Sequence, residues 1–167
     1  MTLIIGYGNE LRGDDAVGLR VAEAVDRLKL PDTRVLAVHQ LTPELAEQLS
    51  QASAAIFVDA AVDGPPGQVE VAPCAPVDLG RPLGHISDPD MLLALAEAVF
   101  GRTPSAWLVK VQVEATELGE PLSAGAEQGV RAAVAVVAKL VRQLGSDRAA
   151  ASGNPQDDPG PVQKQDS

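Results

Sequence analysis

Residues 3–18 of this chain read LIIGYGNELRGDDAVG, and this stretch decides the fold. Leu3, Ile4 and Ile5 are consecutive apolar residues, which predict a short buried strand. A loop rich in glycine follows, and an amphipathic helix is expected to begin at Asp15 and to end before Pro31. A buried strand, a glycine loop and a helix together indicate the opening unit of a parallel α/β sheet.

The rest of the chain continues this alternation, which predicts a mainly parallel sheet covered by helices on both faces. We expect further strands at residues 35–38, 54–58, 68–72 and 107–113, and further helices that begin at Thr42, Asp88 and Ser123. The strand at 68–72 alternates apolar and polar residues, as a half-exposed edge strand does. The helix from Ser123 carries a stripe of valines and is expected to end at Gly145.

The length of 167 residues suits one domain. We assign residues 1–145 to a single α/β domain. Residues 146–167 are mainly Ala, Ser, Pro, Gln and Asp, so ordering them would cost backbone entropy with little apolar burial in return. We therefore expect 146–167 to form a disordered C-terminal tail.

The composition excludes several classes of partner. A formal net charge of -10 opposes binding to nucleic acid or to an anionic membrane, because both are bound largely through Lys and Arg. Cys74 is the only cysteine, so no internal disulfide can form. The amino terminus has no basic region followed by a long apolar stretch, and we therefore expect a soluble cytoplasmic protein.

The loop from Gly6 to Asp15 lies where dinucleotide-binding proteins place their phosphate loop. Phosphate binding is disfavoured, because Asp14 and Asp15 put two carboxylates at the helix start and Leu11 replaces the third glycine of the phosphate-binding pattern. The structural alternative is that Asp14 caps the helix and Asp15 interacts with its dipole. One carboxylate is enough for the cap, so Asp15 is the better candidate for a functional role.

Two more residues are candidates for the same site. Asp59 ends the third strand, and in doubly wound sheets strands one and three usually flank the ligand crevice. His85 lies in a loop rich in Pro and Gly. Taken alone, Asp59 could equally form a turn and a loop histidine is more often structural, but two carboxylates and one imidazole would make an open site compatible with nickel, zinc or cadmium. His39, at the end of the second strand, is the second choice for the nitrogen ligand.

Three motifs resemble those of the hydrogenase maturation proteases. Residues 6–18 match the opening G-x-G-N-x-L-x-x-D-(D/E)-x-x-G of that family. Residues 56–60, with the sequence IFVDA, are similar to its third strand, and residues 85–93, HISDPDMLL, to its histidine loop and the helix that Pro begins. Together these motifs are distributed over most of residues 1–145.

The resemblance implies a three-layer α/β/α sandwich on a five-stranded mixed sheet, in the order 2-1-3-5-4 with strand 4 antiparallel. It implies an endopeptidase that removes the C-terminal extension of a nickel-iron hydrogenase large-subunit precursor after nickel insertion. Asp15, Asp59 and His85 match the family's nickel-sensing residues, the nickel being carried by the substrate, with no tightly bound cofactor of the protease's own. Residues 39–45 depart from the glycine-rich segment of many members and resemble the variant in proteases that serve bidirectional NAD(P)-linked hydrogenases.

Other functions compete with this interpretation. A thiol or serine protease is disfavoured, because Cys74 has no helix N-terminus beside it and Ser87 lacks the G-x-S-x-G turn. A non-catalytic nickel-binding chaperone or a nucleotide-binding module could use the same fold.

Overall fold

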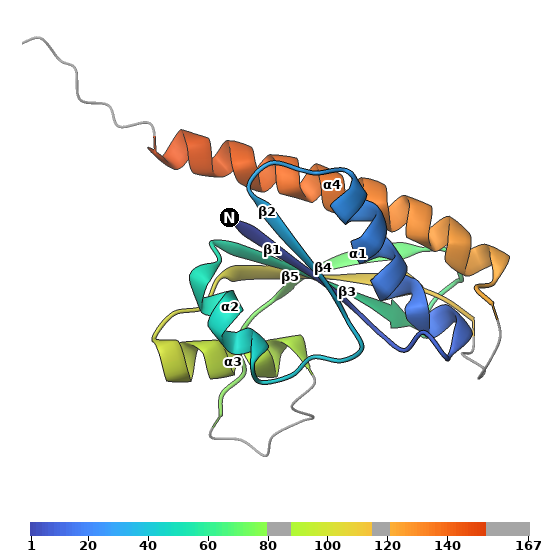
Figure 1. The fold of residues 1–167 in the computed structure, drawn as a ribbon, viewed down its shortest axis with the longest axis horizontal. Coiled ribbons are helices and arrows are strands. Elements are labelled where there is room, and N and C mark those ends of the chain that lie inside the picture. The colour runs from blue at the N-terminus through green and yellow to red at the C-terminus, as the bar shows by residue number, and fades with distance from the viewer. Residues whose placement is uncertain (80–87, 115–120, 153–167) are drawn as a thin grey trace, which may run out of the picture.

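The computed structural model describes residues 1–79, 88–114 and 121–152. Five strands form one sheet in the order β2-β1-β3-β5-β4 (Figure 1). They are β1 (Thr2–Tyr7), β2 (Thr33–Val38), β3 (Ala54–Ala61), β4 (Val69–Cys74) and β5 (Ser105–Gln112). Strands β2, β1, β3 and β5 are parallel, and β4 pairs with β5 in the antiparallel direction at the edge. The predicted strand order and the antiparallel edge strand are confirmed.

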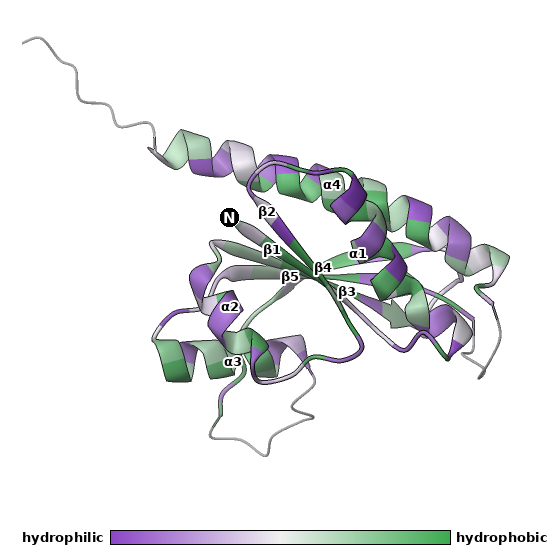
Figure 2. Ribbon diagram, viewed as in Figure 1, coloured by the Kyte–Doolittle hydropathy of each residue, from purple (hydrophilic) through white to green (hydrophobic). Residues whose placement is uncertain are grey.

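Helices cover both faces of the sheet (Figure 1). Helices α1 (Val17–Arg27) and α4 (Ala124–Ser152) pack on one face, where Ile4, Ile56 and Val58 belong to the same apolar cluster as the valines of both helices. Helices α2 (Leu45–Gln51) and α3 (Pro89–Phe100) pack on the other face, against Ile5 and Phe57. Alternate residues of each strand thus enter opposite cores, and in Figure 2 the hydrophobic residues follow the strands between the two helical layers.

Two helices begin differently from the prediction. A short 3₁₀ turn, η1 (Gly13–Ala16), precedes α1, so the regular helix begins at Val17 instead of Asp15. Helix α2 begins at Leu45 instead of after Thr42, because the Thr42 carbonyl accepts a hydrogen bond from the Leu45 N–H (3.1 Å) in a separate turn. By contrast, α3 begins at Pro89 and ends at a left-handed Gly101 (φ 72°), as the sequence predicts.

The end of α4 corrects the predicted boundary at Gly145. The helix continues to Ser152, through a segment rich in the strong helix former alanine. The guanidinium of Arg148 donates a hydrogen bond to the Thr2 hydroxyl (3.2 Å), which ties this extension to the first strand. Residues 146–152 are therefore helical, while the rest of the predicted tail, 153–167, lies outside the described residues. None of the helices in the described ranges combines the length and apolar character that crossing a membrane requires.

Candidate active site

Three glycines of the opening motif allow α1 to pack directly against the ends of β1 and β3. A Cβ atom on Gly18 would lie 2.2 Å from the Tyr7 carbonyl oxygen and 2.6 Å from that of Val58. A Cβ atom on Gly6 would lie 2.0 Å from the carbonyl oxygen of Gly18, and Gly8 has φ 147°, which favours glycine. The glycine pattern therefore serves a close approach between backbones, and it fixes the loop over the carboxyl ends of the strands.

Asp14 is a buried structural carboxylate at this edge, with 5% of its surface exposed. Its two oxygens accept hydrogen bonds from the Ser123 N–H (2.7 Å) and from the Ser123 hydroxyl (2.7 Å). The Ser123 hydroxyl oxygen in turn accepts from the Ala126 N–H (3.1 Å) in the first turn of α4. Asp14 therefore holds the start of α4, whereas the sequence interpretation had it cap its own helix, where no side-chain capping bond is found.

Asp15 is half-buried and lies in η1, beside the loop that follows β1. Its Oδ2 atom accepts a hydrogen bond from the Asn9 N–H (2.9 Å), and the Asn9 side-chain oxygen accepts one from the Leu11 N–H (2.9 Å). These bonds close the loop around the carboxylate. Adjacent aspartates thus have different environments, since Asp14 is fully engaged with α4 and Asp15 lies closer to solvent.

Asp59 lies near the carboxyl end of β3, on the strand next to β1. Its Oδ1 atom accepts a hydrogen bond from the Ala60 N–H (2.8 Å), and the Tyr7 hydroxyl lies close to its carboxylate. Burial raises the pKa of Asp59 to about 6, although the Tyr7 hydroxyl and the Ala60 N–H oppose that rise, and the negative charge of Asp15 raises it further. The charge of Asp15 therefore acts on the Asp59 carboxyl, which titrates at about pH 6.

An open pocket of about 400 Å³ adjoins Asp59. It lies between the end of β4 and the start of α3, and its walls include Tyr7, Cys74, Asp88 and Asp90. Burial, followed by the charge of Asp90, raises the pKa of the Cys74 thiol to about 11. A thiol that stays protonated near neutral pH is a poor nucleophile, which agrees with setting aside a cysteine protease.

The structure tests the predicted ligand set only in part. Asp15 in η1 and Asp59 near the carboxyl end of β3 lie on two elements that are in contact, but His85 lies outside the described residues. His39 is exposed after β2, on the far side of β1 from β3. Within residues 1–79, 88–114 and 121–152 no group of three or more His, Cys, Asp or Glu side chains is placed to hold a metal ion. The three-residue site therefore stays a prediction.

The sequence interpretation missed the other residues around Asp59. The sequence pattern assigns no functional role to Tyr7 or Asp90, and it places Asp88 only at the start of a helix. The available signal was position, because Tyr7 ends β1 directly beside the end of β3.

No protein-family model matches the chain, and no curated protein sequence matches it either. Solved structures do. The hydrogenase maturating endopeptidase HybD from E. coli is 26% identical with a TM-score of 0.69, over 86% of this chain and 93% of that one. The NiFe hydrogenase maturation protease HycI from Thermococcus kodakarensis KOD1 is 25% identical with a TM-score of 0.68, over 84% and 92%. Another structure, of an endopeptidase from Escherichia coli, is 25% identical with a TM-score of 0.65. These similarities support a peptidase.

Proposed function

We propose that this chain belongs to the hydrogenase maturation proteases and removes the C-terminal extension from the large-subunit precursor of a nickel-iron hydrogenase, after nickel insertion. The observation that carries the proposal is the placement of Asp15 and Asp59. Asp15 lies in the motif that resembles the family's opening, Asp59 lies near the carboxyl end of β3, and the charge of Asp15 acts on the pKa of Asp59. The similarity to HybD and HycI over most of the chain supports the same reaction class.

The nickel in this proposal belongs to the substrate. We propose that it meets Asp15, Asp59 and His85, because two carboxylates and an imidazole form an open ligand set of suitable chemistry. The metal would fix the scissile peptide beside these residues, so that only a nickel-loaded precursor is positioned for cleavage. The site therefore requires no tightly bound cofactor of its own.

Asp59 is our candidate for the general base. Its pKa of about 6 leaves it mostly ionised at neutral pH yet able to hold a proton. A water oxygen would attack the carbonyl carbon of the scissile peptide while a water proton passes to Asp59. The same proton would then reach the amide nitrogen as the C–N bond breaks. Asp15 would contribute negative charge and a ligand oxygen.

Finer features of the proposal rest on sequence alone. We place the reaction in the cytoplasm, with neither nucleic acid nor membrane as a partner. Residues 39–45 favour the subgroup that serves bidirectional NAD(P)-linked hydrogenases.

Cleavage of purified precursor, with and without nickel, tests the proposal by mass spectrometry. We expect the wild-type protein to release a defined C-terminal peptide from the nickel-loaded precursor only. Asp15→Asn is expected to abolish release, while Asp26→Asn on the exposed side of α1 serves as the matched control and retains it. An unchanged precursor mass with wild-type protein would refute the peptidase and favour a nickel-binding chaperone. Full cleavage by Asp15→Asn would refute the site.

A further inference from the structure

Tyr7 combines a core position with a polar group at the candidate site. It is the last residue of β1, and the pairing of Gly6 with Val58 brings it beside Asp59 on β3. Its ring packs against the apolar cluster that α2 and α3 form with the sheet. Tyr7 and Asp59 also line the same pocket. The ring is therefore held by the core while the hydroxyl reaches the carboxylate.

Donor groups from two different strands lie at the Asp59 carboxylate. The Ala60 N–H donates a hydrogen bond from β3 itself, and the Tyr7 hydroxyl of β1 lies close enough to lower the pKa of Asp59. An ionised carboxylate can accept about four hydrogen bonds, so these two donors leave part of its capacity for a ligand. Two donors from two rigid elements also restrict rotation of the side chain. Asp59 is thus oriented before any ligand arrives.

A comparison with Asp15 shows what the Tyr7 hydroxyl adds to the environment of Asp59. Its donor is the Asn9 N–H, which belongs to a loop rather than to a strand. Carboxylates that bind metals or act in catalysis need such outer hydrogen bonds to hold their geometry, and a donor on a rigid strand holds it better than one on a loop. A tyrosine that only filled the core would be replaceable by phenylalanine, since the ring alone makes the apolar contacts.

We propose that Tyr7 is a positioning residue, whose hydroxyl fixes the Asp59 carboxylate in the orientation in which it meets the precursor's nickel and scissile peptide. This inference rests on the proposed function. It assigns the hydroxyl a role in the reaction that is separate from the packing of the ring.

Tyr7→Phe removes the hydroxyl and keeps the ring, so it tests the proposal directly. On nickel-loaded precursor we expect kcat to fall by about 10- to 100-fold, as for other outer hydrogen bonds of metal-site ligands. KM should change little, because the docking surface is intact, and the melting temperature should stay near that of the wild type. Thr33→Val, which removes a hydroxyl bonded to the Leu30 carbonyl far from the site, is the matched control and should cleave at the wild-type rate.

A crystal structure of Tyr7→Phe separates this inference from the proposed function. We expect Asp59 to occupy more than one side-chain orientation in the variant and a single one in the wild type. Unchanged kcat, or an Asp59 that keeps one orientation without the hydroxyl, would overturn the positioning role. Failure of the wild-type protein to cleave any precursor would count against the proposed function, and the crystal structures would still decide whether Tyr7 orients Asp59.

Discussion

Charged side chains are held differently at the two ends of the parallel strands, which we call the amino edge, where the strands begin, and the carboxyl edge, where they end. At the amino edge, the carboxylate of Asp32 forms ion pairs with the amino group of Met1 (3.1 Å) and the guanidinium of Arg148 (3.4 Å). At the carboxyl edge, no described residue forms an ion pair with Asp15 or Asp59, and backbone N–H groups and a tyrosine hydroxyl hold them instead. The Asp32 carboxylate is thus matched by two positive charges, whereas the carboxylates of Asp15 and Asp59 stay available, as the proposed binding of a cation requires.

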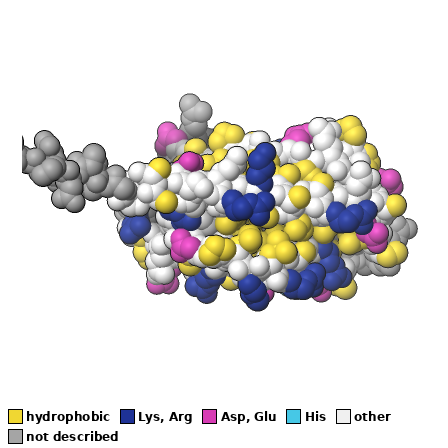
Figure 3. All heavy atoms as spheres, turned by 90° about the horizontal axis from the view of Figure 1, so that it is seen from above, with side chains coloured by type: hydrophobic (Ala, Val, Ile, Leu, Met, Phe, Trp, Pro, Cys, Tyr) yellow, Lys and Arg dark blue, Asp and Glu magenta, His cyan; other side chains and the backbone are white. Residues whose placement is uncertain are grey.

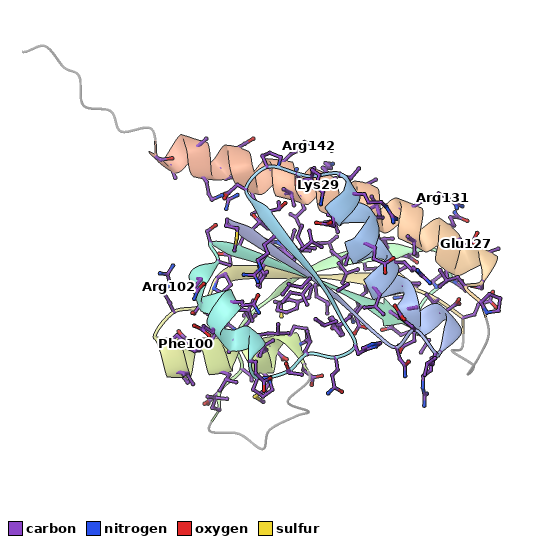
Figure 4. All side chains as sticks on the ribbon, viewed as in Figure 1. Lys29, Phe100, Arg102, Glu127, Arg131 and Arg142 are labelled. Carbon is purple, nitrogen blue, oxygen red and sulfur yellow. The ribbon has the colours of Figure 1, made fainter. Side chains whose placement is uncertain are left out.

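The distribution of cations supports this contrast. Figure 3, which looks onto the side of α4, shows Lys and Arg side chains around an apolar area. Figure 4 places Lys29, Arg131 and Arg142 on this α1 and α4 side of the molecule. Lys110 on β5 does lower the pKa of Asp59, but it is the last of the contributions and does not offset burial. Within the described residues, none of these cations forms an ion pair with Asp15 or Asp59.

The largest expected effect is that of Gly18→Ala at the carboxyl edge. The new methyl group would collide with the backbone of Tyr7 and Val58, which cannot move aside like a flexible side chain. Overpacking against backbone should lower the free energy of unfolding by about 3 kcal/mol or more. Urea denaturation followed by circular dichroism measures the loss.

The matched control for Gly18→Ala lies at the other edge. A Cβ on Gly145 would meet no atom within 4 Å, and Gly145 lies inside α4. Gly145→Ala should therefore raise the free energy of unfolding by about 0.5–1 kcal/mol through helix propensity. Equal effects of the two alanines would contradict the close packing that we assign to the opening motif.

The second effect concerns Asp14, the carboxylate at the same edge that we assign to the fold. Asp14→Ala leaves the N–H and hydroxyl of Ser123 without their acceptor in a partly buried place. The expected loss in the free energy of unfolding is about 2–3 kcal/mol, because hydrogen bonds to a charged group are the stronger kind. Hydrogen exchange should show faster opening of the first turn of α4. A variant as stable as the wild type would mean that Asp14 does not hold α4.

The sequence alone predicted those features of the fold that depend on neighbouring residues and on short motifs. The alternation of elements predicted a mainly parallel sheet, the resemblance to the family implied the strand order, and the ends of α3 followed from Pro89 and Gly101. Contacts between distant residues were missed. Asp14 bonds to a serine 109 positions away, so the sequence pattern did not show that it holds the start of α4. Arg148 bonds to Thr2, 146 positions away, and the pattern likewise did not show that α4 continues past Gly145. The proximity of Tyr7 and Asp59 joins two strands, and it became visible only once the register of those strands was known.

The third effect is a pH dependence of stability from Asp59. The pKa of Asp59 is raised from 3.8 to about 6, so the folded state holds the carboxyl proton more tightly than the unfolded state does. The resulting contribution to the free energy of unfolding is fully present below the unfolded pKa of 3.8 and is lost as the pH rises through about 6. Asp59→Asn carries no such charge and should be more stable than the wild type by about 2 kcal/mol at pH 7.5, with the difference shrinking toward pH 4.

Urea denaturation of the wild type and Asp59→Asn at pH 4, 5, 6 and 7.5 measures this difference. A difference of the expected size would show that the ionised Asp59 carboxylate lowers the stability of the fold at the carboxyl edge. Two stability curves that run parallel across this range would show that burial does not penalise the Asp59 carboxylate.

The smallest effect is expected at the amino edge, from Arg148→Ala. The variant loses the ion pair with Asp32 and the hydrogen bonds to Thr2 and Ser53, but the Arg148 and Asp32 side chains are 32% and 61% exposed. Water already stabilises such charges, so the loss should be about 0.5–1 kcal/mol, and smaller in 1 M salt. Arg142→Ala, on the exposed side of the same helix, is the matched control and should change stability less. A loss above that of Asp14→Ala would reverse the contrast between the edges, because the paired charges would then be the ones on which the fold depends most.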